Sequence, residues 1–208
     1  MARIRTDKEV KAIKDSLASA KYRERFEFIL EQAVDKDGLL EYLDATEPQV
    51  VHFAAHGKRG ELILEPSDDK RRSVNSRWLG RVFQHFKVHV RLVVFSSCSA
   101  REHAEVICQS IECVVAMTEE VADDDARTFS THLYSSLASG KSVDHAFGRA
   151  KDALGGDDDL FVLRCRPGVD ATKVFFVART ERPPELRLRV HCPPESNAEW
   201  PYPLLRPY

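Results

Sequence analysis

Two stretches of the sequence decide its fold, PQVVHFAAHG at residues 48–57 and RLVVFSSCS at residues 91–99. Each begins with an apolar run of strand length and ends in small or polar residues. Continuous apolar runs of this length are typical of parallel strands that are covered on both faces. The two stretches therefore predict two buried parallel strands of an α/β protein.

Helical patterns alternate with these strands and with others. Val10, Ile13 and Leu17 recur at helical spacing after the sequence TDKE at 6–9, which has the form of a capping box, and predict a helix over about 7–20. More helices are predicted around 39–43 and over 75–86, 101–110, 122–139 and 142–154, with Gly140 as a C-cap. Further strands are predicted over 26–31, 60–65, 112–117, 160–163 and 173–178. This order predicts a three-layer α/β/α sandwich around a mostly parallel sheet.

Composition and charge exclude several classes of protein. The chain has 208 residues, of which 43% are hydrophobic and 31% charged, and its formal net charge is −2; this balance is that of a soluble globular protein. No stretch approaches the ~18 consecutive apolar residues of a membrane-spanning helix, and the polar start MARIRTDKEV does not have the form of a signal peptide. We therefore expect a cytoplasmic protein with neither a membrane nor a nucleic acid as its partner.

The C-terminal part of the chain has a different composition. Seven of the ten prolines lie in the last 26 residues, from Pro183 onward, and proline blocks helices and removes backbone donors. The sequence therefore predicts a domain over 1–178 and a proline-rich extension or linker over 179–208. This extension could join a further domain, place a strand at 186–190 over a sheet edge, or lie near the functional site.

The cysteines indicate neither a disulfide framework nor a metal site. Their number, five, is odd, and no short CxxC pair is present. Cys108 and Cys113 are loosely spaced for a metal, and Cys113 lies in a predicted strand, so both are expected to be core thiols. The sequence also lacks a GxxxxGK[ST] phosphate loop, and Gly155-Gly156 precedes three aspartates that would repel phosphate. We therefore expect no metal and no cofactor.

The two decisive strands end in residues with complementary chemistry, His56-Gly57 in the first and Cys98 in the second. The carboxyl ends of adjacent parallel strands meet at one rim of a sheet, where catalytic groups gather. A cysteine attacks a carbonyl as the thiolate, and an imidazole can take or deliver the proton. Gly57 lets a backbone N–H approach an oxyanion, and the helix predicted after Cys98 favours the thiolate. Either residue alone would more often be structural, but together they indicate a nucleophilic cysteine.

The stretches PQVVHFAAHG, RLVVFSSCSAREHAEVICQSIECVVAM with the sequence that follows it, and FVLRCRPGVD resemble the CHAT domain, a bacterial branch of the caspase-like cysteine peptidases. The resemblance covers roughly residues 3–178 and implies a caspase-like fold and a cysteine endopeptidase. It implies a catalytic dyad of His56 and Cys98, and an oxyanion hole formed by the N–H groups of Gly57 and Cys98. It further implies a protein or peptide substrate, a bacterial signalling or defence system, and an upstream sensor or activating partner that gates the activity.

An acidic segment follows the strand predicted over 112–117 and should reach the same rim. It contains Glu119 and Asp123, and two interpretations of it are open. The segment can be the acidic first turn of a helix, which stabilises that helix by about a few tenths of a kcal/mol per group. Alternatively, a carboxylate lines the pocket for the substrate residue before the cut, and Asp123 matches a position at which relatives commonly carry Asp. Such a carboxylate would select Arg or Lys, so Asp123 and Glu119 are predicted to bind substrate.

Two departures from the family pattern support an alternative function. Only Ile4 is available for the hydrophobic strand that usually precedes the first helix, and residues after 178 have no counterpart. The alternative is a catalytically silent interaction module that recruits a protein partner, although the joint pattern of His56-Gly57 and Cys98 favours the peptidase. A nucleotide-binding domain is disfavoured because the phosphate loop is missing. His52 would lie on the same strand face as His56 but about 13 Å away, and is predicted to be a packed, hydrogen-bonded core residue.

Overall fold

The structure is a computed structural model that describes residues 6–31, 34–55, 57–58, 61–64, 72–97, 100–119, 121–155 and 160–177. All of these residues belong to the first of two units, Met1–Ala178, and the second unit comprises Arg179–Tyr208. The second unit lies outside the described residues. The role predicted for 179–208, an extension or linker, therefore stays a prediction.

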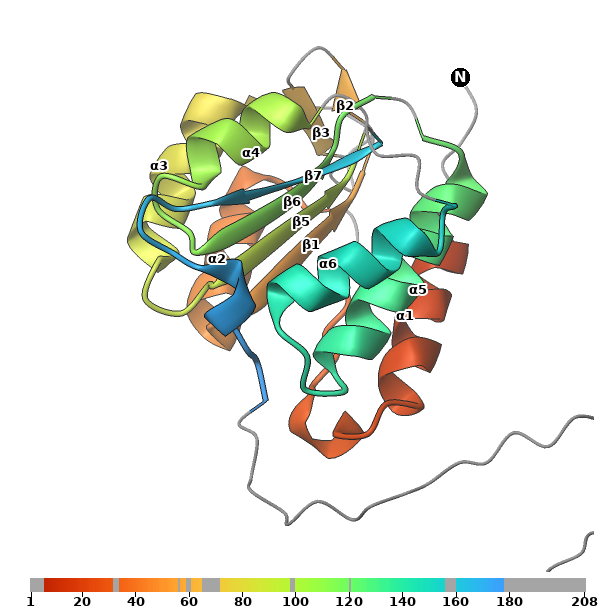
Figure 1. The fold of residues 1–208 in the computed structure, drawn as a ribbon. Coiled ribbons are helices and arrows are strands. Elements are labelled where there is room, and N and C mark those ends of the chain that lie inside the picture. Colours follow the sequence, from red (N-terminus) through yellow and green to blue (C-terminus); the bar gives the residue numbers. More distant parts are fainter. Residues whose placement is uncertain are drawn as a thin grey trace, which may run out of the picture. The chain divides into compact units, whose positions relative to one another are not determined.

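A four-stranded sheet forms the centre of the fold (Figure 1). Its strands, in spatial order, are β1 (Val50–Ala54), β5 (Leu92–Ser96), β6 (Cys113–Met117) and β7 (Phe161–Cys165). The first three run parallel, and β7 runs antiparallel to β6. Every residue of β5 and β6 is buried, as the apolar runs predict, whereas β1 lies at the sheet edge and is only half-buried.

Helices cover both faces of this sheet (Figure 1). One face carries α1 (Thr6–Ala18), α5 (Asp123–Leu137) and α6 (Val143–Asp152), and the other carries α2 (Lys36–Thr46), α3 (Ser76–Phe86) and α4 (Arg101–Ile107). The predicted caspase-like α/β/α sandwich with a mostly parallel sheet is thus confirmed. None of the described helices is long and apolar enough to cross a membrane.

Local sequence signals set several of the helix ends. Asp35, Asn75 and Ser142 are N-caps whose side chains accept hydrogen bonds from the backbone N–H groups at the starts of α2, α3 and α6. Gly140, predicted as a C-cap, follows α5 with φ +74°, and a Cβ atom there would lie 3.0 Å from Cε2 of Tyr22. The position therefore requires glycine for its conformation and for its close packing.

A smaller antiparallel sheet lies between β1 and α3 in the chain. It consists of β2 (Gly57–Lys58), β3 (Glu61–Leu64) and β4 (Arg72–Asn75), with β3 in the middle. Leu62, Leu64 and Val74 are buried in the core on the side of α2, α3 and α4. The strand predicted over 60–65 is confirmed as β3, whereas its partners β2 and β4 were not predicted as strands.

Two predicted strands are wrong. Residues 26–31 form no strand, although Phe26 and Phe28 pack on the core while Ile29 and Leu30 are about half exposed. Of the strand predicted over 173–178, residues 173–177 are described, and they form the end of the 3-10 helix η2 (Ala171–Lys173) and a bend. There the guanidinium of Arg91 donates a hydrogen bond of 2.8 Å to the carbonyl of Phe175, which a strand ladder would otherwise use. Both segments place apolar side chains in the core without joining a strand ladder.

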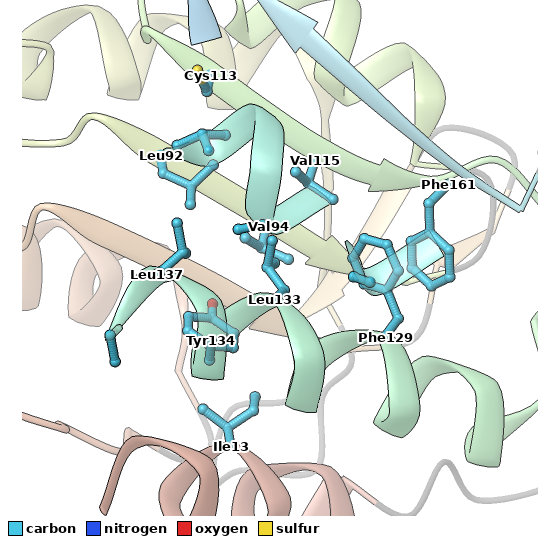
Figure 2. Packing of buried hydrophobic residues seen from close by; sticks show 14 of the residues in the cluster. Ile13, Leu92, Val94, Cys113, Val115, Phe129, Leu133, Tyr134, Leu137 and Phe161 are labelled. Atoms are coloured by element: carbon cyan, nitrogen blue, oxygen red, sulfur yellow. The ribbon is translucent and has the colours of Figure 1, made fainter. Parts of the chain in front are cut away.

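The helices α1 and α5 meet the sheet through one apolar core (Figure 2). Leu133 and Phe129 of α5 point toward Val94 of β5 and Phe161 of β7 (Figure 2). The rings of Phe129 and Phe161 are stacked, with centroids 3.7 Å apart and planes at 3°. Phe129 is fully buried, so its ring is in contact on all sides.

We predict that Phe129→Ala lowers the free energy of unfolding by about 3–5 kcal/mol, because it removes a large buried ring and leaves a cavity. Urea denaturation measures the change. The control is Val88→Ala, whose side chain is 77% exposed and whose removal should change stability by less than about 0.5 kcal/mol. Equal losses in the two variants would contradict this assignment of the core.

Candidate functional site

The carboxyl ends of three parallel strands meet at one rim of the central sheet. Ala54 of β1 pairs with Ser96 of β5, and Phe95 of β5 pairs with Ala116 of β6. The strands β1, β5 and β6 therefore end side by side. His56 and Cys98 follow the paired residues Ala54 and Ser96 by two positions each in the sequence, and both lie outside the described residues.

The backbone on either side of these two positions is held by the sheets. Gly57 begins β2 and pairs with Leu62 of β3. Near Cys98, Ser97 is buried, and the N–H of Ala100 donates a 3.1 Å hydrogen bond to the carbonyl of Met117 at the end of β6. The helix predicted after Cys98 is confirmed as α4, but it ends at Ile107 rather than at 110.

The acidic segment lies at the carboxyl end of β6, at the same rim of the sheet. Glu119 follows β6 by two residues, Asp123 is the first residue of α5, and both are exposed. The first turn of α5 contains three aspartates, as the interpretation as an acidic helix start predicts. Within this turn Asp124 pairs with Arg127 at 3.0 Å. The role of Asp123 and Glu119 in binding substrate stays a prediction.

A buried carboxylate lies against the middle of β1 and the last residue of β5. Glu9 of α1 is 5% exposed, and its Oε1 accepts hydrogen bonds from the hydroxyl groups of Ser96, at 2.6 Å, and Ser130, at 2.7 Å. The Nε2 of His52 lies 3.4 Å from the same oxygen, and its Nδ1 is 3.0 Å from the hydroxyl of Tyr134. We call these five residues the Glu9 network; it joins α1, β1, β5 and α5.

The network keeps Glu9 ionised in spite of its burial. Desolvation by burial opposes the charge, but the nearby His52 ring and the hydrogen bonds from the two serine hydroxyls outweigh it and hold the pKa of Glu9 at about 2. Burial, and next the charge of Glu9, raise the pKa of the Tyr134 phenol. At neutral pH the network therefore contains a carboxylate and a neutral phenol.

The Glu9 network is the feature of this site that the sequence analysis missed. Glu9 was interpreted as part of a capping box, but its carboxylate contacts interior side chains instead. A signal was present, because Glu9 lies four residues before Ile13 and eight before Leu17, on the buried stripe of α1. The prediction that His52 is a packed, hydrogen-bonded residue is confirmed by its contact with Tyr134.

The thiols in the described part of the chain have the character of core residues. Cys108 and Cys113 are buried, and burial raises the pKa of each. The Sγ of Cys113 lies 3.8 Å from the Sγ of Cys165 on the paired strand β7. Thiols with raised pKa values are protonated at neutral pH and react slowly. Within the described ranges no group of three or more His, Cys, Asp or Glu residues could hold a metal ion.

Comparisons with known proteins find one family and one curated relative. Residues 3–163 match the family model described as the CHAT domain. A protein from Gillisia limnaea named "Probable protease" is 24% identical over 153 residues, which are 71% of this chain and 27% of that protein. The chain thus spans little more than a quarter of the length of this relative.

We predict that the Glu9 carboxylate stabilises the fold by about 3 kcal/mol at neutral pH, since its pKa lies near 2 instead of 4.5. A lowered pKa stabilises the folded state above pH 4.5, and this contribution is lost as the pH falls from 4.5 toward 2. Urea denaturation at several pH values, for the wild type and Glu9→Gln, measures it. The difference between the two proteins should be largest at pH 6–7 and shrink below pH 4.5. A difference that is constant with pH would contradict the ionised state of Glu9.

Proposed function

Because the chain belongs to the CHAT domain family, we propose that it is a caspase-like cysteine endopeptidase that cleaves a protein substrate after a basic residue. One structural observation carries the proposal. Ala54 and Ser96, each two residues before a dyad residue, are paired in register on adjacent parallel strands. This pairing supports a site in which His56 and Cys98 work on the same peptide bond.

In the proposed mechanism Cys98 is the nucleophile and His56 the general acid and base. The Cys98 thiolate attacks the carbonyl carbon of the scissile bond, and the N–H groups of Gly57 and Cys98 stabilise the oxyanion. The His56 imidazolium then gives its proton to the leaving amine, and a thioester to Cys98 remains. A water molecule, deprotonated by His56, attacks the thioester and releases the acid and the free thiol.

The preference for a basic residue rests on the acidic segment at the end of β6. Asp123 and Glu119 are exposed at the rim of the sheet where β1 and β5 also end. A carboxylate in a substrate pocket forms charge-assisted hydrogen bonds with Arg or Lys and disfavours acidic or apolar side chains. We propose Asp123 as the principal contact and Glu119 as a second one.

We further propose that a protein partner gates this activity in the cytoplasm, as part of a bacterial signalling or defence system. Family membership supports this part of the proposal. A peptidase that acts on cellular proteins would damage them without such control, and ordering of a catalytic site by a partner is a common means of control.

We predict that iodoacetamide modifies Cys98 faster than the other four cysteines, Cys108, Cys113, Cys165 and Cys192, because an imidazole partner favours the thiolate. Mass spectrometry of peptides from briefly labelled protein measures the five rates. His56→Ala should remove the advantage of Cys98, whereas the control His132→Ala, a histidine in the middle of α5, should leave it unchanged. Equal rates at Cys98 and at the other thiols would instead support the interaction module.

We predict that a proteome incubated with the wild-type chain gains new protein termini after Arg or Lys, and that Cys98→Ala yields none. Asp123→Asn should reduce cleavage after basic residues by about 10- to 100-fold, the value of one or two charge-assisted hydrogen bonds. Mass spectrometry of N-terminal peptides measures both effects. Asp124→Asn is the matched control, because the neighbouring Asp124 is already paired with Arg127. An equal effect of the two variants would contradict a specific role for Asp123.

A further inference from the structure

We propose that the Glu9 network is a positioning device for the dyad, in which one buried carboxylate sets the spacing of β1 and β5 where these strands lead into His56 and Cys98. The inference rests on the proposed function. It assigns Glu9, His52 and Ser96 as positioning residues, and none of them as a catalytic residue.

The first support is the place of the contacts in the strands. Ser96 lies two residues before Cys98, and His52 lies four residues before His56. Both side chains reach the same oxygen of Glu9. In the ladder His52 pairs with Val94, and Ser96 pairs with Ala54, so the carboxylate connects the two strands diagonally. A shift of one strand along the other would break at least one of these contacts.

The second support is the weak attachment of β1. Among the described strands β1 pairs with β5 alone and lies at the edge of the four-stranded sheet. A strand held by one ladder can twist or slide more easily than a central strand. The contacts of His52 with Glu9 and Tyr134 attach β1 to α1 and α5 as well. They supply the restraint that a second neighbouring strand would otherwise give to the histidine side of the dyad.

The third support is the cost of any other arrangement. Glu9 is buried, and the groups that face it are His52 from β1, Ser96 from β5, and Ser130 from α5, with Tyr134 behind His52. A carboxylate that loses such partners in an apolar interior strongly destabilises the folded state. The network therefore has few alternative geometries, and stiff surroundings are what a nucleophile and its base require, because small displacements cost much of the rate.

The same network reaches the helix that carries the proposed specificity residue. Ser130 lies seven residues, or two turns, after Asp123 on α5, and therefore on the same side of the helix. Through Ser130 and Tyr134 the network fixes the depth and rotation of α5 against the two strands. One buried charge thus connects β5, which leads to Cys98, with β1, which leads to His56, and with α5, which begins at Asp123.

The test measures the rate of alkylation of Cys98 by iodoacetamide in the full chain as a function of pH, together with the urea midpoint. We expect Ser96→Ala and Glu9→Gln each to slow alkylation at pH 7 by about 10- to 100-fold. We also expect the midpoint of the pH profile to rise toward about 8.5, that of an ordinary thiol. The control is Ser136→Ala, which removes a buried hydroxyl of α5 that has no partner in the described part of the chain, and it should change neither the rate nor the profile.

The outcomes separate this inference from the proposed function. If wild-type Cys98 reacts rapidly and depends on His56, but folded Ser96→Ala and Glu9→Gln proteins keep the wild-type rate and pH profile, the dyad stands and the positioning role is overturned. If wild-type Cys98 reacts no faster than the core thiols, both are overturned. Should Glu9→Gln fail to fold, Ser96→Ala, which removes one hydroxyl and leaves the carboxylate with two contacts, decides the question alone.

Discussion

A carboxylate that is buried in an apolar core constrains every element around it. Removing an ionised group from water costs several kcal/mol unless hydrogen bonds and opposite charge replace the lost hydration. Glu9 obtains its replacements from β1, β5 and α5 at once. These contacts favour the observed docking position of helix α1 on the sheet, because a shift of the helix would take the carboxylate away from its donors. Apolar contacts such as that of Ile13 add to the stability but tolerate small shifts.

The constraint acts where the chemistry is proposed to occur. A parallel sheet brings the carboxyl ends of its strands together, but it places them only as accurately as the strands are held. The central strands β5 and β6 are fully buried and are each paired on both sides. The strand β1, which leads to His56, is half-buried and paired on one side. The Glu9 network adds a restraint to a strand that the sheet holds on one side only.

The sequence predicted the layers of the fold better than it predicted strand pairing. Apolar runs such as 50–54 and 92–96 identified the parallel strands, because helices that pack on both faces of the sheet favour apolar side chains along the whole strand. The alternation at Phe26 and Phe28 was misleading, because a period of two reports which side chains are buried and not whether the backbone pairs. The short strands β2 and β4 bring few residues to the core, so composition says little about them. Their pairing with β3 is a tertiary event.

The same distinction applies to the site. The motif residues His56 and Cys98 follow apolar runs, so the strands that precede them could be predicted, because strand and motif are adjacent in sequence. Ser96 and Ser130 are 87 and 121 residues away from the glutamate that they contact, and no local pattern links residues so far apart. What the sequence did contain was a glutamate on the buried stripe of one helix and a histidine inside an apolar run of strand length. Each of these is uninformative alone, because Glu9 also accepts hydrogen bonds from two serines and His52 contacts Tyr134, so several pairings of buried polar groups were possible. The contact between α1 and β1, and with it the restraint on β1, depends on the tertiary packing that brings both residues to the same place.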